Sequence, residues 1–455
     1  MANKTISEKG KYGLFTVVMM IVGIVVGSGI YFKSSTILIA TNGNIAIGIV
    51  VFCIAAISII FGSLTIAQLA SRTEEAGGVI SYATNEINSY AGCAIGWYHT
   101  FLFYTSCVGI LGWISSIYME EVFYWHFSLE QRFLAAILFI AFFFGLNLFA
   151  SKIGAYFQTS AAIIKLIPLI IIGILGYIFG DFNNFISTST SVVTQSNGSY
   201  FGWISAIAPV AFAFEGWIVA TTLTHKIKNP KKNLPLALMF APLGILLVYV
   251  FYFVGVSLYV GPDDIMTMKD TYVQYAATNL FGPSAGKLVV VCVLIAVLGT
   301  LNGNIMGSIQ MPYSLALREM LPFSKKISKV NKTFDTPINS GIIAFITSII
   351  LLCFIYFDKK YTILGNSDLA EIIIVINYLL YIMLYIKVIN LTNKKEIKGI
   401  FKGYVSPVMA IIGSCIMVYG GLQNQMFIYV SLLCLAVILI SIIFWNIKSK
   451  KLSNR

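Results

Sequence analysis

The sequence IVGIVVGSGIYF, residues 21–32, interrupts an apolar segment with Gly27-Ser28-Gly29. Breaking a helix inside a bilayer frees backbone N–H and C=O groups, and each costs several kcal/mol if it stays unpaired in hydrocarbon. Such a break is therefore expected only where a cavity, water or a ligand satisfies those groups. Glycine suits the position because it tolerates non-helical angles and lets a ligand approach the backbone.

The chain that follows this break would begin a new helix, whose N-terminal amides carry partial positive charge and attract a carboxylate. An alternative is that Gly-Ser-Gly is only a close-packing motif between continuous helices. The residues expected to form the carboxylate site are Gly27, Ser28, Gly29, Ile30 and Tyr31.

A second interruption lies in APVAFAFEGWIVA, residues 208–220, where Glu215 is the only acidic residue well inside an apolar segment. A carboxylate near the bilayer midplane costs at least ~2.5 kcal/mol and is functional by default. The alternative is a buried acid bonded to a neighbouring helix. Carbonyl groups freed at this break would suit an ammonium group, and two aromatic rings could close over a ligand. The residues expected to contribute are Phe212, Ala213, Phe214, Glu215 and Gly216.

If the two breaks face each other, backbone amides at the first and carbonyl groups at the second would bind the two ends of a small zwitterion. An α-amino acid fits such a site. Paired interruptions at matching positions of two halves are the best sequence indication of a transporter binding site.

Lys165, in QTSAAIIKLIPLI at 158–170, is a second charge inside an apolar segment. Its ammonium group could bond the carbonyl groups exposed by the first break and act as a fixed substitute for sodium. Alternatively, its long side chain could snorkel to the membrane surface. Lys33, near the end of the first segment, is expected to snorkel outward or to face a vestibule. Asn302 and Asn304 could equally be interhelical bonds or cavity lining.

The composition identifies the bilayer as the solvent of this chain. Of its 455 residues, 58% are hydrophobic and only 11% are charged, with a mean hydropathy of +0.86, whereas a soluble protein has about 25% charged residues. Most apolar segments reach the 18 or more residues that a membrane-crossing helix needs. The sequence predicts an all-α polytopic membrane protein of about twelve helices, at 13–40, 45–70, 92–118, 133–150, 157–180, 203–224, 236–260, 286–317, 338–357, 370–390, 404–420 and 427–446.

Positive charge is distributed very unevenly over the two sides of this topology. With the N-terminus inside, 23 of the 30 Lys and Arg residues fall on the inner side, five on the outer side and two within the helices. By the positive-inside rule, we expect both termini to lie in the cytoplasm. The membrane is then expected to be the inner or plasma membrane of the cell. The same distribution argues against nucleic acid as the reason for the net charge of +12. The seven cysteines lie in or beside apolar segments without a CxxC motif, which is typical of packing residues rather than a metal site.

The two interruptions fall in helices one and six, which correspond if helices one to five (13–180) and six to ten (203–390) are two repeats. A repeat of five crossings enters the membrane from opposite sides in its two copies, so the repeats would be inverted. The last two helices (404–446) complete a single transmembrane domain over 1–446, and a basic cytoplasmic tail (447–455) is expected to follow it.

At this point the sequence resembles the amino acid–polyamine–organocation (APC) superfamily, and within it the bacterial L-amino-acid-transporter-like branch. The residues that carry the resemblance are Gly27-Ser28-Gly29-Ile30, Gly77-Gly78 with Tyr82, Phe212 to Trp217, IKNPKKNLPLAL at 227–238, and Leu317-Arg318-Glu319 ahead of Pro322.

The resemblance implies a LeuT-like 5+5 inverted-repeat fold, alternating access, and Phe212 as an aromatic gate. The lysine matching Lys165 is similar to one thought to make transport sodium-independent in that branch. Two features depart from the family: Ile218 replaces a polar residue, and Thr224-His225-Lys226 stands where many relatives have an acidic pair.

We therefore expect a secondary active amino-acid transporter, working by sodium-independent exchange or proton-coupled uptake, with membrane lipid around it. A carrier of basic amino acids or polyamines is an alternative, because Glu215 could favour an extra cation. A membrane sensor or channel is a rival from another class. No catalytic, ATP-binding or metal motif is present, so neither an enzyme nor a cofactor is expected; the substrate's side chain, the coupling ion and the oligomeric state stay open.

Overall fold

The computed structural model describes residues 12–27, 29–73, 75–183, 185–186, 202–207, 210, 213–365 and 367–453. Over these ranges the chain is helical, and the only β pairing consists of the isolated bridges Tyr12–Ile227 and Asn331–Thr336. The prediction of an all-α chain is confirmed.

Ten helical stretches within the described residues are long and apolar enough to cross a membrane. Two of them join α-helix to a π-helical turn: Ser89–Phe123, where α5, η2 and α6 follow one another without a gap, and Phe401–Gly421, where η6 precedes α19. The ten stretches are Ile45–Ala70, Ser89–Phe123, Leu129–Phe149, Ser151–Phe179, Pro230–Val260, Pro283–Leu317, Ile338–Tyr361, Leu369–Asn393, Phe401–Gly421 and Phe427–Lys451.

These stretches correspond to named elements. They are α3 (Ile45–Ala70), α5 (Ser89–Tyr98) with η2 (His99–Phe103) and α6 (Tyr104–Phe123), α7 (Leu129–Phe149), α8 (Ser151–Phe179), α12 (Pro230–Val260), α15 (Pro283–Leu317), α17 (Ile338–Tyr361), α18 (Leu369–Asn393), η6 (Phe401–Val405) with α19 (Ser406–Gly421), and α20 (Phe427–Ser453).

The two remaining predicted spans are the interrupted ones. The first consists of α1 (Leu14–Val25) and α2 (Gly29–Ala40), each of 12 residues. The sixth, predicted as 203–224, has only short helical pieces in its described part: η3 (Gly202–Ala206), α11 (Val219–Thr222) and η4 (Thr224–Lys226). A turn at 214–218 divides the segment, so the interruption predicted in this span is confirmed.

Short elements connect the long helices. They are α4 (Val79–Tyr82), η1 (Ala83–Ile87), α13 (Pro262–Met268), η5 (Lys269–Thr271), α14 (Tyr272–Phe281) and α16 (Ser324–Ile327). Residues 269–281, KDTYVQYAATNLF, have the spacing of a short amphipathic helix, and η5 and α14 cover them.

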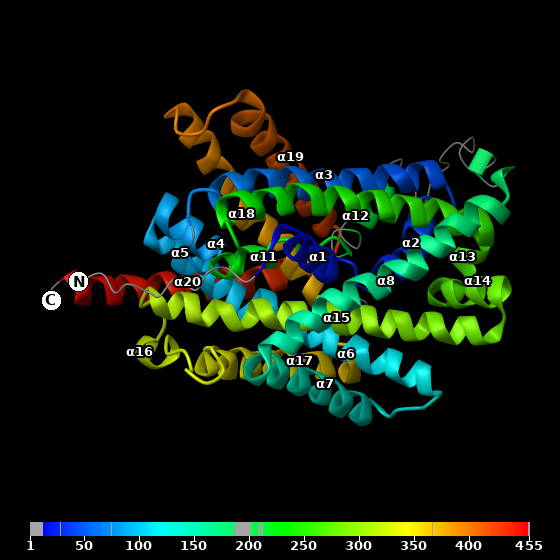
Figure 1. Cartoon of the computed structure of the whole chain (residues 1–455), viewed down its shortest axis with the longest axis horizontal. Helices are drawn as coiled ribbons and strands as arrows, with labels where there is room; N and C mark the ends of the chain where they lie inside the picture. Colours follow the sequence, from blue (N-terminus) through cyan, green and yellow to red (C-terminus); the bar gives the residue numbers. More distant parts are fainter. Residues whose placement is uncertain are drawn as a thin grey trace.

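The broken first helix lies in the middle of the bundle. Figure 1 shows α1 between α12 and α15, with α8 crossing obliquely beside it, and α1 contacts all three of these helices. Half of the residues of α1 are buried, including Val17, Ile21 and Ile24, and the buried ones dominate its last turns. The break at its end is therefore enclosed by protein rather than by lipid, as a non-helical backbone at membrane depth requires.

Glycine permits the closest helix contacts around this centre. A Cβ atom at Gly255 of α12 would lie 2.8 Å from the Cα atom of Gly173 on α8. The two backbones therefore touch, which is the small-residue packing that membrane helices use in place of hydrophobic driving force.

We predict that Gly255→Ala destabilises the protein by about 1–3 kcal/mol, because the added methyl group must push α8 and α12 apart. Gly244→Ala on the same helix is the matched control, since nothing lies within 4 Å of the added Cβ atom. Thermal unfolding in detergent measures the difference. Equal melting temperatures for the two variants would contradict this account of the α8–α12 contact.

Candidate functional site

The predicted break in the first helix is confirmed. Helix α1 ends at Val25, Val26 adopts an extended conformation (φ −71°, ψ 93°), and α2 begins at Gly29. Ser28 lies outside the described residues. The carbonyl groups in the last turn of α1 consequently lose their ordinary helical partners.

Lys165 reaches one of these carbonyl groups. Its Nζ atom donates a hydrogen bond to the Gly23 oxygen over 2.5 Å, and its side chain is fully buried. The side chain does not snorkel to the surface. The expectation that the ammonium group bonds a carbonyl exposed by the first break is confirmed, while its role in place of sodium stays a prediction.

A tyrosine that the sequence did not single out joins the two breaks. The Tyr249 hydroxyl, on α12, lies 2.9 Å from the Ala213 oxygen and 3.3 Å from the Val25 oxygen. The Thr300 hydroxyl, on α15, lies 3.5 Å from the Val26 oxygen. Side chains from α8, α12 and α15 therefore occupy the end of α1.

The second break is a turn that includes Phe214 to Ile218. Gly216 has φ +112°, a conformation that L side chains rarely adopt, and a Cβ atom there would meet Ile24 of α1. Glycine is required here both for its backbone angle and for its close approach to α1. Phe212, the predicted gate, lies outside the described residues.

The two breaks face one another across a cavity. A Cβ atom at Gly29 would lie 3.2 Å from both the Cα and the Cβ atoms of Ala213, so the start of α2 packs directly against the second break. A small cavity of about 30 Å³ lies beside this contact, so an amino acid would fit only if the two segments moved apart. Its walls are formed by Val25, Gly27, Gly29, Cys107, Leu111, Ala213, Glu215, Gly216, Thr300, Asn304 and Ile374.

Glu215 is the charged residue in these walls. Its side chain is only 8% exposed, and its Oε2 atom accepts a hydrogen bond of 3.3 Å from the Tyr378 hydroxyl of α18. Its Oε1 atom has no hydrogen-bond partner within the described part of the chain. A buried carboxylate oxygen without a donor favours a ligand that brings one.

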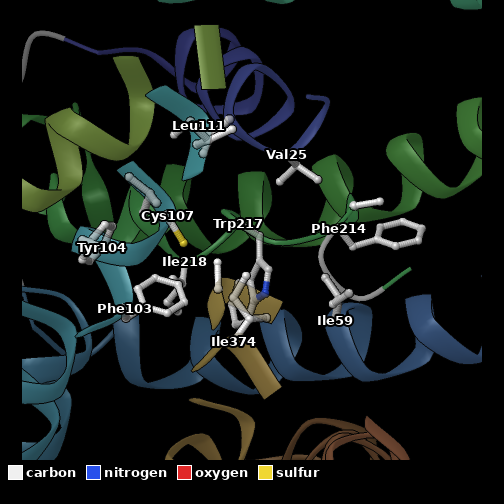
Figure 2. Packing of buried hydrophobic residues seen from close by; sticks show 14 of the residues in the cluster. Val25, Ile59, Phe103, Tyr104, Cys107, Leu111, Phe214, Trp217, Ile218 and Ile374 are labelled. Carbon is white, nitrogen blue, oxygen red and sulfur yellow. The ribbon is translucent and has the colours of Figure 1, made fainter. Parts of the chain in front are cut away.

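One predicted site residue, Phe214, lies differently from expectation. Phe214 is buried against Phe52 and Tyr249, with ring centroids 6.4 and 4.9 Å away, and is absent from the cavity walls. Figure 2 shows its ring on one side of Trp217, with Cys107 on the other. The Tyr31 hydroxyl donates to the Lys165 carbonyl oxygen over 2.6 Å, so its side chain braces α2 against α8. The group predicted to bind the carboxylate at this position is the Tyr31 amide, which stays a prediction.

The structure separates the two asparagines of α15. Asn304 is in the cavity wall, where its Nδ2 atom donates to the Thr300 oxygen over 3.0 Å, whereas Asn302 bonds to other helices. Thr300 and Asn304 are four residues apart and share a helix face, a signal that could have been read from the sequence. Cys107, Leu111, Ile374 and Tyr249 carried no such signal, because each lies in a uniformly apolar or aromatic stretch.

Two ion pairs join residues outside the cavity walls. Lys33 forms an ion pair of 3.0 Å with Glu371 of α18. Arg318 forms an ion pair of 2.6 Å with Glu75.

Comparisons with known proteins identify the family of the chain. The profile of the family described as Amino acid permease matches residues 12–454. The chain belongs to the amino acid permease family.

Its relatives include characterised amino-acid carriers. The permease is 28% identical over 413 residues to the serine/threonine exchanger SteT of Bacillus subtilis (strain 168), covering 89% of this chain and 90% of the relative. It is 26% identical to the mouse b(0,+)-type amino acid transporter 1 over 66% of this chain and 61% of the relative. For the human cystine/glutamate transporter the identity is 20%, over 76% and 68%. The resemblance to the APC superfamily is thereby confirmed, and the permease is an amino-acid transporter.

We predict that Gly29→Leu in this permease lowers substrate affinity by at least tenfold, because the new side chain fills the cavity at the start of α2 and meets Ala213. Gly145→Leu on α7 is the control, since a Cβ atom there has nothing within 4 Å. Binding of labelled amino acids to detergent-purified protein measures the affinity, and size-exclusion profiles report folding. Retained affinity in a folded Gly29→Leu protein would remove Gly29 from the site.

Proposed function

We propose that this permease is a secondary active transporter that carries amino acids by alternating access, without sodium, through exchange or proton-coupled uptake. The observation that supports this proposal is the cavity between two broken segments whose backbones touch at Gly29 and Ala213. A binding site at the junction of two non-helical breaks is the arrangement that transporters with inverted repeats use.

In this proposal, residues 13–180 and 203–390 are the two inverted repeats of five helices, and 404–446 forms two further helices, giving twelve in all. The uneven charge distribution places both termini in the cytoplasm of a cell membrane. On this orientation the Lys33–Glu371 ion pair lies toward the outside and the Arg318–Glu75 pair toward the cytoplasm.

The backbone of the substrate is assigned to the two breaks. The carboxylate group binds at the start of α2, to the amides of Gly29, Ile30 and Tyr31, where the helix dipole is positive. The ammonium group binds at the second break, near Ala213 and Glu215. Both breaks are then satisfied by a single zwitterion.

Lys165 supports the absence of sodium coupling. Its ammonium group already bonds the Gly23 oxygen at the end of α1. The position beside the first break where a sodium ion would bind is therefore taken by a positive charge of the protein itself. A second cation beside it would be repelled.

A second candidate is a carrier of cationic amino acids or polyamines. It is favoured by the unpaired Oε1 atom of Glu215, which lies in the cavity wall and is nine-tenths buried. A substrate with an amino or guanidinium group on its side chain would pair with this carboxylate.

The proposal is tested by reconstituting the permease into proteoliposomes and measuring uptake of the twenty labelled amino acids and common polyamines. We expect uptake driven by internal amino acid or by a proton gradient, and unchanged when choline replaces sodium. Loss of uptake without sodium would remove the cation-substitute role of Lys165. An ohmic current in the absence of a substrate gradient would favour a channel instead, and no uptake of any compound would favour a sensor.

We predict that Glu215→Gln changes selectivity rather than folding. If the carboxylate binds a side-chain cation, the variant should lose at least tenfold of its affinity for L-lysine but less than threefold for L-serine. Competition against the best labelled substrate measures both affinities. Asn304→Asp on the opposing α15 is the comparison variant, since it adds a carboxylate to the same cavity. An equal loss for both amino acids would mean that Glu215 serves the substrate backbone instead.

A further inference from the structure

Three buried amide side chains form a continuous hydrogen-bonded chain away from the cavity walls. The Asn147 Nδ2 atom, on α7, donates to the Asn302 Oδ1 atom on α15 over 2.8 Å. The Asn302 Nδ2 atom donates in turn to the Gln158 Oε1 atom on α8 over 2.9 Å. Asn302 and Gln158 are fully buried and Asn147 is 5% exposed. We call Asn147, Asn302 and Gln158 the amide relay.

The relay is tightly specified by further bonds. Asn147 Nδ2 also donates to the Phe143 oxygen of its own helix over 2.8 Å, and Asn302 Nδ2 to the Gly154 oxygen of α8 over 3.1 Å. These bonds leave each amide group only one orientation. If the oxygen and nitrogen atoms of one amide exchanged places, two N–H donors or two oxygen acceptors would face each other. The relay therefore fixes the rotation and the height of α8 against α7 and α15.

The last member of the relay reaches the broken helix. A Cβ atom at Gly23 of α1 would lie 2.9 Å from the Gln158 Nε2 atom, and one at Gly303 of α15 would lie 3.1 Å from it. The Gln158 amide is thus lodged between two glycine backbones, one of which belongs to the last turn of α1. A bulkier side chain at this position would have to move α1 or α15.

Gln158 and Lys165 lie on the same face of α8. Seven residues correspond to nearly two full turns of an α-helix, so their side chains point in about the same direction. Both meet the same residue of α1: Gln158 packs against Gly23, and Lys165 bonds its carbonyl oxygen. A shift or rotation of α8 at Gln158 would therefore move the Lys165 ammonium group away from that oxygen.

We propose that the amide relay positions Lys165, by holding α8 in the one register at which its ammonium group meets the end of α1. Asn147 and Asn302 are then positioning residues that act on the site through Gln158. The proposal rests on the proposed role of Lys165 at the first break, but it concerns a contact that can be measured without transport.

The test compares amide hydrogen exchange of residues 22–31 in purified full-length permease, without added substrate. We expect Lys165→Ala and Asn302→Leu each to speed exchange of this segment by about tenfold, because both release the last turn of α1. Since both act on one contact, the double variant should exchange no faster than either single variant. Exchange rates that multiply in the double variant, or an unchanged rate in Asn302→Leu, would overturn the proposal.

Two further variants keep the test independent of a folding defect. Gln158→Asn alone shortens the relay by one methylene group and should speed exchange, whereas adding Asn302→Gln restores its length and should return the rate to within threefold of wild type. Thr159→Val is the matched control on α8, because its hydroxyl bonds only the Ala155 oxygen of its own helix. Failure of the length-restored double variant to recover, while its melting temperature is that of wild type, would also overturn the proposal.

Transport separates this proposal from the proposed function. In proteoliposomes, Asn302→Leu should reduce the maximal rate for the best substrate of the wild type about tenfold, with less than a threefold change in KM, because Asn302 is absent from the cavity walls. If the wild type carries nothing, the proposed function fails while the exchange experiment still decides the role of the relay.

Discussion

The architecture depends on one constraint: a helix cannot be broken at membrane depth unless its freed carbonyl groups find partners. Helix α1 stops at Val25, and its last oxygens are taken by Lys165, Tyr249 and Thr300 from three different long helices. Each of those helices is therefore anchored to the end of α1. The centre of the bundle is organised around these bonds rather than around a uniform apolar core.

This constraint explains why the polar residues of the site come from separate parts of the chain. Lys165 and Thr300 are 135 positions apart, yet both reach the same turn of α1. Tyr249 is bonded to both breaks at once, so movement of one break relative to the other must disturb its hydroxyl contacts. A ligand that replaces or reorders these contacts would act directly on the geometry of both segments, which is the link that alternating access requires.

The cavity is polar only where it must be. Its polar side chains are Glu215, Thr300 and Asn304, and the rest of the wall consists of glycine backbones and of Val25, Cys107, Leu111, Ala213 and Ile374. Behind that wall the amide relay adds polar bonds that are fully satisfied between three helices, apart from the Gln158 Nε2 atom, which has no partner among the described residues. Buried amide chains of this kind specify one arrangement of helices more strictly than apolar packing does.

Local chemistry was enough for the sequence to indicate the solvent, the broken first segment, the glutamate of the second break and the lysine that bonds the first. Length and hydropathy identify membrane helices because the bilayer has fixed thickness, and Gly-Ser-Gly or an isolated charge is costly there wherever it lies. The sequence did not predict the contacts between helices. Tyr249 has the same residue type and apolar surroundings as the other tyrosines of α12, and residue type does not distinguish Asn302 from Asn304. Only the tertiary structure decided that one asparagine faces the cavity and the other joins the relay, because two positions 200° apart around a helix meet different neighbours.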